Sequence, residues 1–164
     1  DMENMTGKVW ILGDDIDTDI IIPTEYLAMK TIDDMKQYAF SPLRPELAGQ
    51  IQKGDIIVAG KNFGCGSSRE QAPEIIKALG IQCVIAKSFA RIFFRNAINN
   101  GLLLIEQPDL YDDIKEGDTI TVHMNKHVDY NGKEYPIAAL PENLMRIIQD
   151  GGLVGAMRKL NGLD

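Results

Sequence analysis

The middle of the chain constrains the fold most, because short apolar segments alternate there with amphipathic segments of helical periodicity. The strand-like segments are residues 55–59, 82–86 and 102–105, and the helix-like segments are residues 67–79 and 88–99. Gly80 follows the first helix-like segment and Asn100-Gly101 the second, where helices commonly end. Strands that alternate with helices in this way form parallel crossovers, so the pattern predicts an α/β protein.

The flanking segments extend this sheet with strands of a different kind. Residues 8–12 predict a first strand and residues 119–124 an alternating one. Asn131-Gly132 is typical of a hairpin turn, and Pro141 predicts the start of a helix that runs to Gln149. We therefore expect a mixed sheet with parallel βαβ crossovers, flanked by helices.

Size and composition indicate one domain. The chain has 164 residues, 45% of them hydrophobic, which is enough for a single core. We expect this domain to span residues 5–164, with residues 1–4 a disordered or added end. No apolar run reaches the roughly 20 residues that cross a bilayer, and the start lacks a signal-peptide pattern, so we expect a soluble, cytoplasmic protein.

The charge and the cysteines exclude several classes of partner. A net charge of -7 without a clustered basic face argues against nucleic acid and against an anionic membrane. Cys65 and Cys83 are too few for a disulfide framework and match no zinc spacing. An iron–sulfur cluster requires three or four thiolates, so this chain cannot hold one alone.

The glycine-rich segment GKNFGCGSSRE, residues 60–70, joins a predicted strand to a predicted helix. Ser67 and Glu70 fit a capping box, which would start the helix at Ser67 and place its positive end there. A plain N-cap with a glycine turn is one interpretation. Arg69 favours an anion site, since a cation in the first helical turn opposes the dipole but pairs well with a carboxylate. Ser67, among N–H groups and beside Arg69, is then a candidate base.

Other chemistries fit poorly. No G-x-S-x-G elbow is present, and His123 and His127 are interpreted as surface histidines near a turn, so we assign no metal ligand. The acidic series 15–19 lacks the glycine and glutamate of a calcium loop at positions six and twelve. Arg91 lies at the start of the next predicted helix, which should open on the same sheet edge as Ser67, and is a candidate substrate-binding residue.

Three ordered motifs together resemble a known family: GDDIDTDIIIP at 13–23, GKNFGCGSSRE at 60–70 and KSFARIF at 87–93. They are similar to the small subunits of isopropylmalate and homoaconitate dehydratases, which correspond to the swivelling domain of aconitase. The resemblance implies a two-subunit hydro-lyase that interconverts 2-isopropylmalate and 3-isopropylmalate in leucine biosynthesis, by loss and re-addition of water. It also implies a large partner subunit, in a heterodimer or heterotetramer, that carries a 4Fe-4S cluster.

The resemblance also suggests roles for individual residues. Ser67 looks like the base, Arg69 like the arginine that pairs with a substrate carboxylate, and Asp19 like an acidic residue that orients site groups. Ser68 looks like a neighbour that shapes the anion site.

Residues 24–47 look like a mobile substrate-specificity loop, in which Ala28 and Met29 offer apolar surface to an isopropyl or methyl group. Met29 can equally be a packing residue. Lys30 could serve a further carboxylate, so homoaconitase and 2,3-dimethylmalate dehydratase stay open. A non-catalytic anion-binding module is the alternative from another class.

Overall fold

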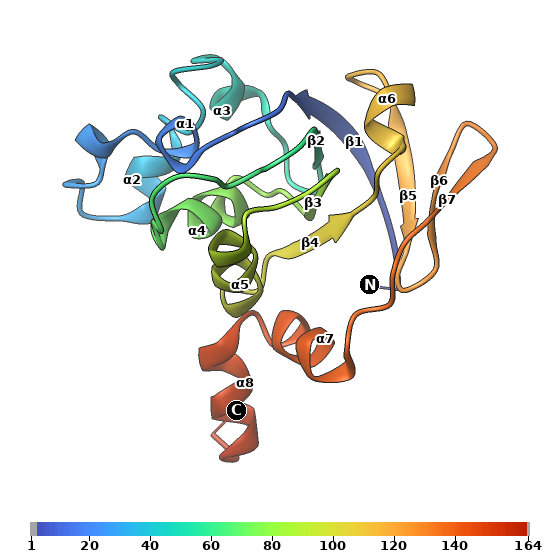
Figure 1. The fold of residues 1–164 in the computed structure, drawn as a ribbon. Coiled ribbons are helices and arrows are strands. Elements are labelled where there is room, and N and C mark those ends of the chain that lie inside the picture. The colour runs from blue at the N-terminus through green and yellow to red at the C-terminus, as the bar shows by residue number, and fades with distance from the viewer. Residues whose placement is uncertain (1–2, 164) are drawn as a thin grey trace.

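A computed structural model describes residues 3–163 and gives them a curled, seven-stranded mixed sheet of order β4-β3-β2-β1-β5-β6-β7 (Figure 1). The strands are β1 Asn4–Leu12, β2 Ile56–Ala59, β3 Cys83–Ala86, β4 Leu103–Glu106, β5 Thr119–His123, β6 His127–Tyr130 and β7 Lys133–Pro136. Strands β1 to β4 are parallel, and β5, β6 and β7 continue the sheet antiparallel from β1. The predicted α/β fold with a mixed sheet is confirmed.

Helices cover both faces of the parallel half. They are α1 Thr18–Ile21, α2 Ile32–Lys36, α3 Leu47–Gln50, α4 Gln71–Ala78, α5 Arg91–Asn99, α6 Leu110–Asp113, α7 Glu142–Gln149 and α8 Leu153–Leu160, with a 3-10 turn η1 at Thr24–Tyr26. In Figure 1, α1, α2 and α4 lie together on one side, and α7 leads to the projecting α8 at the C-terminal end. No helix among residues 3–163 is both long and apolar enough to cross a membrane.

Burial on both faces explains why the parallel strands are uniformly apolar. Every residue of β2 and β3 is buried. Ile57 and Val84 pack toward the core beneath α1, α2 and α4, whereas Ile56 and Ile85 pack toward a second core beneath α6 and α7. Because side chains alternate along a strand, each parallel strand contributes to both cores.

The β6–β7 connection confirms the predicted hairpin. Asn131 and Gly132 are its two loop residues and have φ angles of 51° and 81°. Two successive positive φ angles define the tight turn whose twist matches paired antiparallel strands.

Two predicted helices begin later in the chain than the sequence indicated. The first, α4, begins at Gln71, and Glu70 makes no side-chain cap hydrogen bond, so the capping box at Ser67 is wrong. Pro73 therefore lies in the first turn, where its missing N–H removes no helical hydrogen bond. The second, α5, begins at Arg91.

The chain ends also differ from expectation. Strand β1 begins at Asn4, which pairs with His123 of β5, so this residue belongs to the sheet and not to a disordered end. Residues 1 and 2 of that expected end lie outside the described residues. Helix α8 was not predicted, because residues 153–160 follow two glycines that indicated only a stop.

The expected specificity loop, residues 24–47, contains short ordered pieces. Thr31 caps α2 by accepting a hydrogen bond from the Asp34 N–H at 3.0 Å, and Phe40 and Leu47 are fully buried. Arg44 forms an ion pair with Glu116 at 2.6 Å, which ties the segment to the loop before β5. Mobility of this segment stays a prediction.

Candidate active site

Three loops meet at the carboxyl edge of the parallel strands and hold one another through backbone hydrogen bonds. The loop after β2 lies in the middle: the Gly60 N–H donates to the Gly13 carbonyl at 3.1 Å, and the Gly60 carbonyl accepts from the Lys87 N–H at 3.1 Å. The Phe63 N–H also donates to the Ser88 carbonyl at 3.0 Å. The three motifs that are far apart in the sequence thus form a single structure at the edge where open α/β sheets bind ligands.

Two glycines of the glycine-rich loop have left-handed backbone. Gly64 has a φ of 83° and Gly66 a φ of 90°. A side chain at Gly64 would overlap the ring of Phe93 in α5, whereas one at Gly66 would make only ordinary contacts at 3.5 Å. Gly64 is therefore needed both for the turn and for the close approach of α5.

A cavity of about 230 Å³ lies between this loop and α5. Its lining consists of Thr18, Gly64, Gly66, Ser67, Ser68, Arg69, Ala90, Arg91, Ile92, Phe93 and Asn96. The structure thus brings Ser67, Ser68, Arg69 and Arg91 to one place, as the sequence predicted from the shared sheet edge.

Arg69 is held by residues of the acidic motif 13–23 and by Thr24. Its Nη1 donates to the Asp19 carboxylate at 2.7 Å and to the Ile22 carbonyl at 2.7 Å, and its Nη2 donates to Thr24 Oγ1 at 3.2 Å. The Arg69 side chain is only 11% exposed, while that of Asp19 is 66% exposed. A guanidinium held by several acceptors has a fixed orientation. Asp19, the Ile22 carbonyl and Thr24 therefore fix the orientation of Arg69 in the lining of the cavity.

Thr18 is a site residue for which the sequence favoured only a place in a turn. It is 2% exposed, its N–H donates to the Cys65 carbonyl at 2.9 Å, and its hydroxyl donates to the Ser67 carbonyl at 2.8 Å. Asp17 caps α1 by accepting from the Ile20 N–H at 2.8 Å. Thr18 thereby fixes the backbone of the glycine-rich loop, residues 60–70, which we call the serine loop. The position of Thr18 inside the acidic motif was the sequence signal that could have identified it as a site residue.

The helix end that faces the cavity belongs to α5 and not to α4. Ser67 and Ser68 are exposed loop residues that precede α4, whereas Ala90 and Arg91, at the start of α5, line the cavity. Helix α5 has no side-chain N-cap, so its first N–H groups and its positive dipole end are available to an anion. The site still favours an anion, although for a different reason than the sequence indicated.

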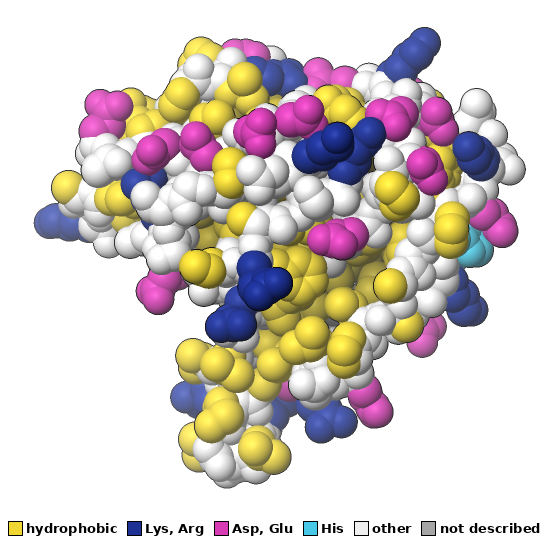
Figure 2. All heavy atoms as spheres, viewed as in Figure 1, with side chains coloured by type: hydrophobic (Ala, Val, Ile, Leu, Met, Phe, Trp, Pro, Cys, Tyr) yellow, Lys and Arg dark blue, Asp and Glu magenta, His cyan; other side chains and the backbone are white. Residues whose placement is uncertain are grey.

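Arg91 also borders a larger, apolar groove of about 550 Å³, whose lining includes Phe94, Arg95, Ile105 and Leu140. Figure 2 shows a hollow lined by hydrophobic side chains on this face, with Lys or Arg side chains over α5 at its edge. Arg91 therefore lies between the 230 Å³ cavity and the apolar groove.

The proposed specificity residues lie apart from this lining. Ala28, Met29 and Lys30 follow η1, and none of them is among the residues that line the 230 Å³ cavity. Ala28 and Lys30 are exposed, and Met29 is half-buried against the core. The Met29 position agrees with the packing interpretation as well as with the specificity one.

The two cysteines are unsuited to thiolate chemistry. Desolvation raises the pKa of the Cys65 thiol, and the nearby Asp17 and Asp15 carboxylates raise it further. Full burial in β3 raises the pKa of Cys83 to about 12. Two protonated thiols cannot supply the thiolates of an iron–sulfur cluster, so the residues of this chain do not fit that group.

The class of this domain is defined by its match to the family model of the aconitase C-terminal domain over residues 16–110. The matched region runs from the acidic motif through the serine loop and α5, and so contains every residue that lines the 230 Å³ cavity.

Similar proteins narrow this class. The chain is 77% identical to the 3-isopropylmalate dehydratase small subunit of Lachnospira eligens, over 99% of both chains. It is 52% identical to small subunit 1 of that enzyme from Archaeoglobus fulgidus, over 94% of this chain and 97% of the relative. The crystal structure of 3-isopropylmalate dehydratase from Methanocaldococcus jannaschii matches with a TM-score of 0.91 and 39% identity, over 98% of this chain and 96% of that one. The chain belongs to the family of 3-isopropylmalate dehydratase small subunits, which are parts of hydro-lyases of the aconitase class.

Proposed function

We propose that this chain supplies the serine base and the carboxylate-binding arginine of a hydro-lyase that interconverts 2-isopropylmalate and 3-isopropylmalate in leucine biosynthesis. The observation that carries the proposal is the convergence of Ser67, Arg69 and Arg91 on one cavity at the positive end of α5. The family membership supports the reaction class.

Ser67 would take the proton from the substrate carbon. Its exposed hydroxyl lies in a loop whose backbone is fixed by the Thr18 hydroxyl, and an Arg and a helix N-terminus lie beside it. Positive potential at this place stabilises an alkoxide and the charge that develops on a carbon next to a carboxylate. Because that charge is larger in the transition state than in the bound substrate, the fixed cations accelerate the reaction and do not merely tighten binding.

Arg69 would pair with a substrate carboxylate, with Asp19 as its positioning residue. The ion pair with Asp19 at 2.7 Å, together with the hydrogen bonds to the Ile22 carbonyl and to Thr24 Oγ1, sets the orientation of the guanidinium before substrate arrives. A preorganised arginine loses little rotamer entropy on binding, which favours bidentate recognition of a carboxylate.

The small size of the cavity supports a shared site. Its 230 Å³ is less than the roughly 300–1,000 Å³ of ordinary small-molecule pockets. We propose that a large partner subunit, in a heterodimer or heterotetramer, closes over it and carries the 4Fe-4S cluster, which supplies Lewis-acid polarisation of the substrate hydroxyl. The cytoplasm is the proposed compartment, since both cysteines are free thiols.

Substrate preference is the finer part of the proposal. The exposed Ala28 and half-buried Met29 would face an isopropyl group once the partner is docked, and burial of an extra carboxylate against them would be costly. Lys30, which is exposed, could instead attract such a carboxylate in homoaconitate. The names of the relatives favour isopropylmalate.

The test is hydration of dimethylcitraconate, homoaconitate and dimethylmaleate by the chain reconstituted anaerobically with its cluster-bearing large subunit. We expect turnover of dimethylcitraconate to exceed that of the others. Preference for homoaconitate would reassign the Ala28-Met29-Lys30 segment. Absence of turnover for all three, with the complex formed and the cluster loaded, would favour the anion-binding module.

A further inference from the structure

A second group of polar side chains lies on the solvent face of the antiparallel half of the sheet. Along β5 and β6, the buried residues Val122 and Val128 alternate with His123, His127 and Asp129 on the opposite face. His123 of β5 is the direct cross-strand partner of His127 of β6, and Asp129 is the partner of Glu134 on β7. Side chains of paired residues on one face lie close enough to interact, so the hairpin register assembles this cluster.

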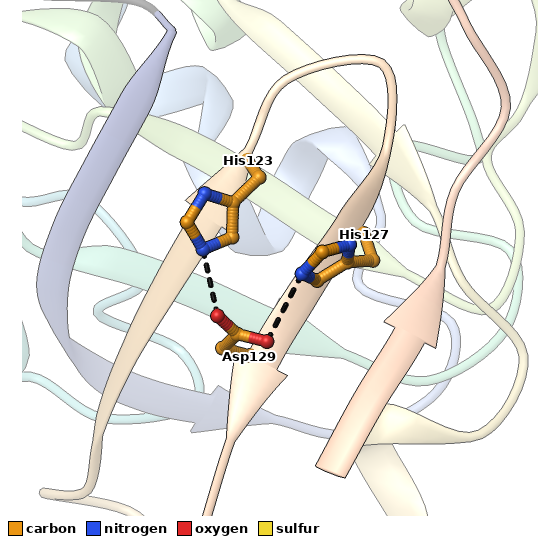
Figure 3. Close-up of side chains that lie close together, drawn as sticks. All are labelled: His123, His127 and Asp129. Carbon is orange, nitrogen blue, oxygen red and sulfur yellow. Dashed lines mark hydrogen bonds and ion pairs between the residues drawn. The ribbon is translucent and has the colours of Figure 1, made fainter. Parts of the chain in front are cut away.

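Both imidazoles point at the same carboxylate (Figure 3). His123 Nε2 lies 2.7 Å from Asp129 Oδ2, and His127 Nε2 lies 3.1 Å from Asp129 Oδ1. His127 Nε2 also lies 3.4 Å from a Glu134 carboxylate oxygen. The donor atoms of His123, His127 and Asp129 all lie within 4.8 Å of one another.

A hydrogen bond to Asn4 fixes the orientation of the His123 ring. Its Nδ1 lies 2.7 Å from Asn4 Oδ1, an amide oxygen from the neighbouring strand β1. An Nδ1–H that donates to this oxygen leaves Nε2 as the nitrogen that faces Asp129. Metal-ligating histidines usually donate their other N–H to a carbonyl or carboxylate in this way, which sets the tautomer and the ring orientation.

We propose that His123, His127 and Asp129 bind a divalent transition-metal ion of the zinc type, with Glu134 as a fourth ligand. Zn–N and Zn–O bonds of about 2.0–2.1 Å in a tetrahedron place neighbouring ligand atoms about 3.3 Å apart. The contacts of 2.7, 3.1 and 3.4 Å within the cluster lie on either side of that spacing, and the separations of up to 4.8 Å would close by side-chain rotation on binding. Two imidazoles with carboxylates suit zinc, cobalt or nickel, whereas calcium and magnesium prefer sites made of oxygen alone.

The site is accessible and separate from the serine loop. The His123 side chain is 30% exposed and that of His127 is 24% exposed, and His123 borders a surface hollow of about 820 Å³. His123 ends a strand that runs antiparallel to β1, so the site lies near the amino end of β1, while the serine loop lies at the carboxyl edge. A bound ion would join β5, β6 and β7 and would stabilise the folded chain without contacting Ser67.

The test uses the full chain without a histidine tag, titrated with Zn²⁺ by calorimetry and with Co²⁺ by visible absorption. The chain has two histidines, so two imidazole signals in a proton–carbon NMR spectrum report on the site directly. We expect one equivalent of metal to bind with micromolar or tighter affinity, and Co²⁺ to broaden both signals. Asp129→Asn and Glu134→Gln should weaken binding by tenfold or more, the latter at an exposed position where folding is not at risk.

The matched control is Asp33→Asn, which removes an exposed carboxylate from α2 and should leave the affinity unchanged. Binding that is no tighter than millimolar would overturn the proposal. So would equal affinities of the chain and its Asp129→Asn variant. A thiolate-to-cobalt absorption band would place the ion at Cys65 and would also overturn it.

Discussion

The close approach of the serine loop to α5 makes Gly64→Ala a severe substitution. The φ of 83° costs a residue with a side chain roughly 1–2 kcal/mol, because left-handed backbone crowds the Cβ. Overlap of the new methyl group with the buried Phe93 ring adds about 1–3 kcal/mol, as overpacking of a core does. We therefore expect a loss of about 2–5 kcal/mol in the free energy of unfolding.

Gly66→Ala is the matched control, since its φ of 90° is similar but its added methyl group would meet only ordinary contacts. It should cost about 1–2 kcal/mol, from the backbone alone. Urea unfolding followed by fluorescence of the single tryptophan, Trp10, measures both variants. Phe93→Leu in the Gly64→Ala background should recover part of the loss. Equal destabilisation by the two glycine variants would refute the packing argument.

Three further predictions concern single contacts. Arg44 lowers the pKa of Glu116 through a hydrogen bond. This pair therefore stabilises the fold above the ordinary glutamate pKa of about 4.3, and the stabilisation is lost as the pH falls below that value. Glu116→Gln should flatten the acid limb of a thermal-melting profile between pH 3 and 6. The raised pKa of Cys65 predicts slower alkylation by iodoacetamide at pH 8 than for free cysteine, measured by mass spectrometry, and an equal rate would contradict it. Trp10→Phe removes one donor to the buried Asp55 carboxylate, at 2.7 Å, and leaves the Gln52 N–H at 2.8 Å. It should cost about 1–3 kcal/mol by circular dichroism in urea, and a change under about 0.5 kcal/mol would show that the Gln52 N–H is sufficient.

Periodicity and turn residues predicted the framework of the fold. The strands around Ile57 and Val84, fully apolar and separated by helical segments, could only be parallel strands covered on both faces. The Asn131-Gly132 pair alone placed a hairpin correctly, because two positive φ angles require such residues.

The start of α4 could not be predicted from its capping pattern. Ser67-x-x-Glu70 fits the local rule, but the Ser67 carbonyl accepts a hydrogen bond from Thr18, a residue 49 positions away, and the helix begins only at Gln71. A tertiary contact of this kind overrides local propensity. The same holds for Asp19 and Arg69, whose pairing depends on the meeting of α1 with the loop before α4.

The grouping of His123 and His127 with Asp129 could not be predicted, because sequence spacing alone does not give cross-strand register. His123 and His127 are four residues apart, which in a helix would share a face, but here they face each other across a short turn. Asp129 joins them only because side chains on a strand alternate with a period of two. The register of β5 with β6 was the missing information.

The most direct test of the proposed chemistry is the turnover of isopropylmalate by the reconstituted two-subunit complex that carries Ser67→Ala, compared with Ser68→Ala. Both serines are exposed and line the same cavity, so neither change should disturb folding. Loss of an acid–base group predicts a fall of roughly 10²-fold or more in kcat for Ser67→Ala and a smaller effect for Ser68→Ala. Unchanged turnover in the assembled Ser67→Ala complex would contradict the assignment of Ser67 as the base.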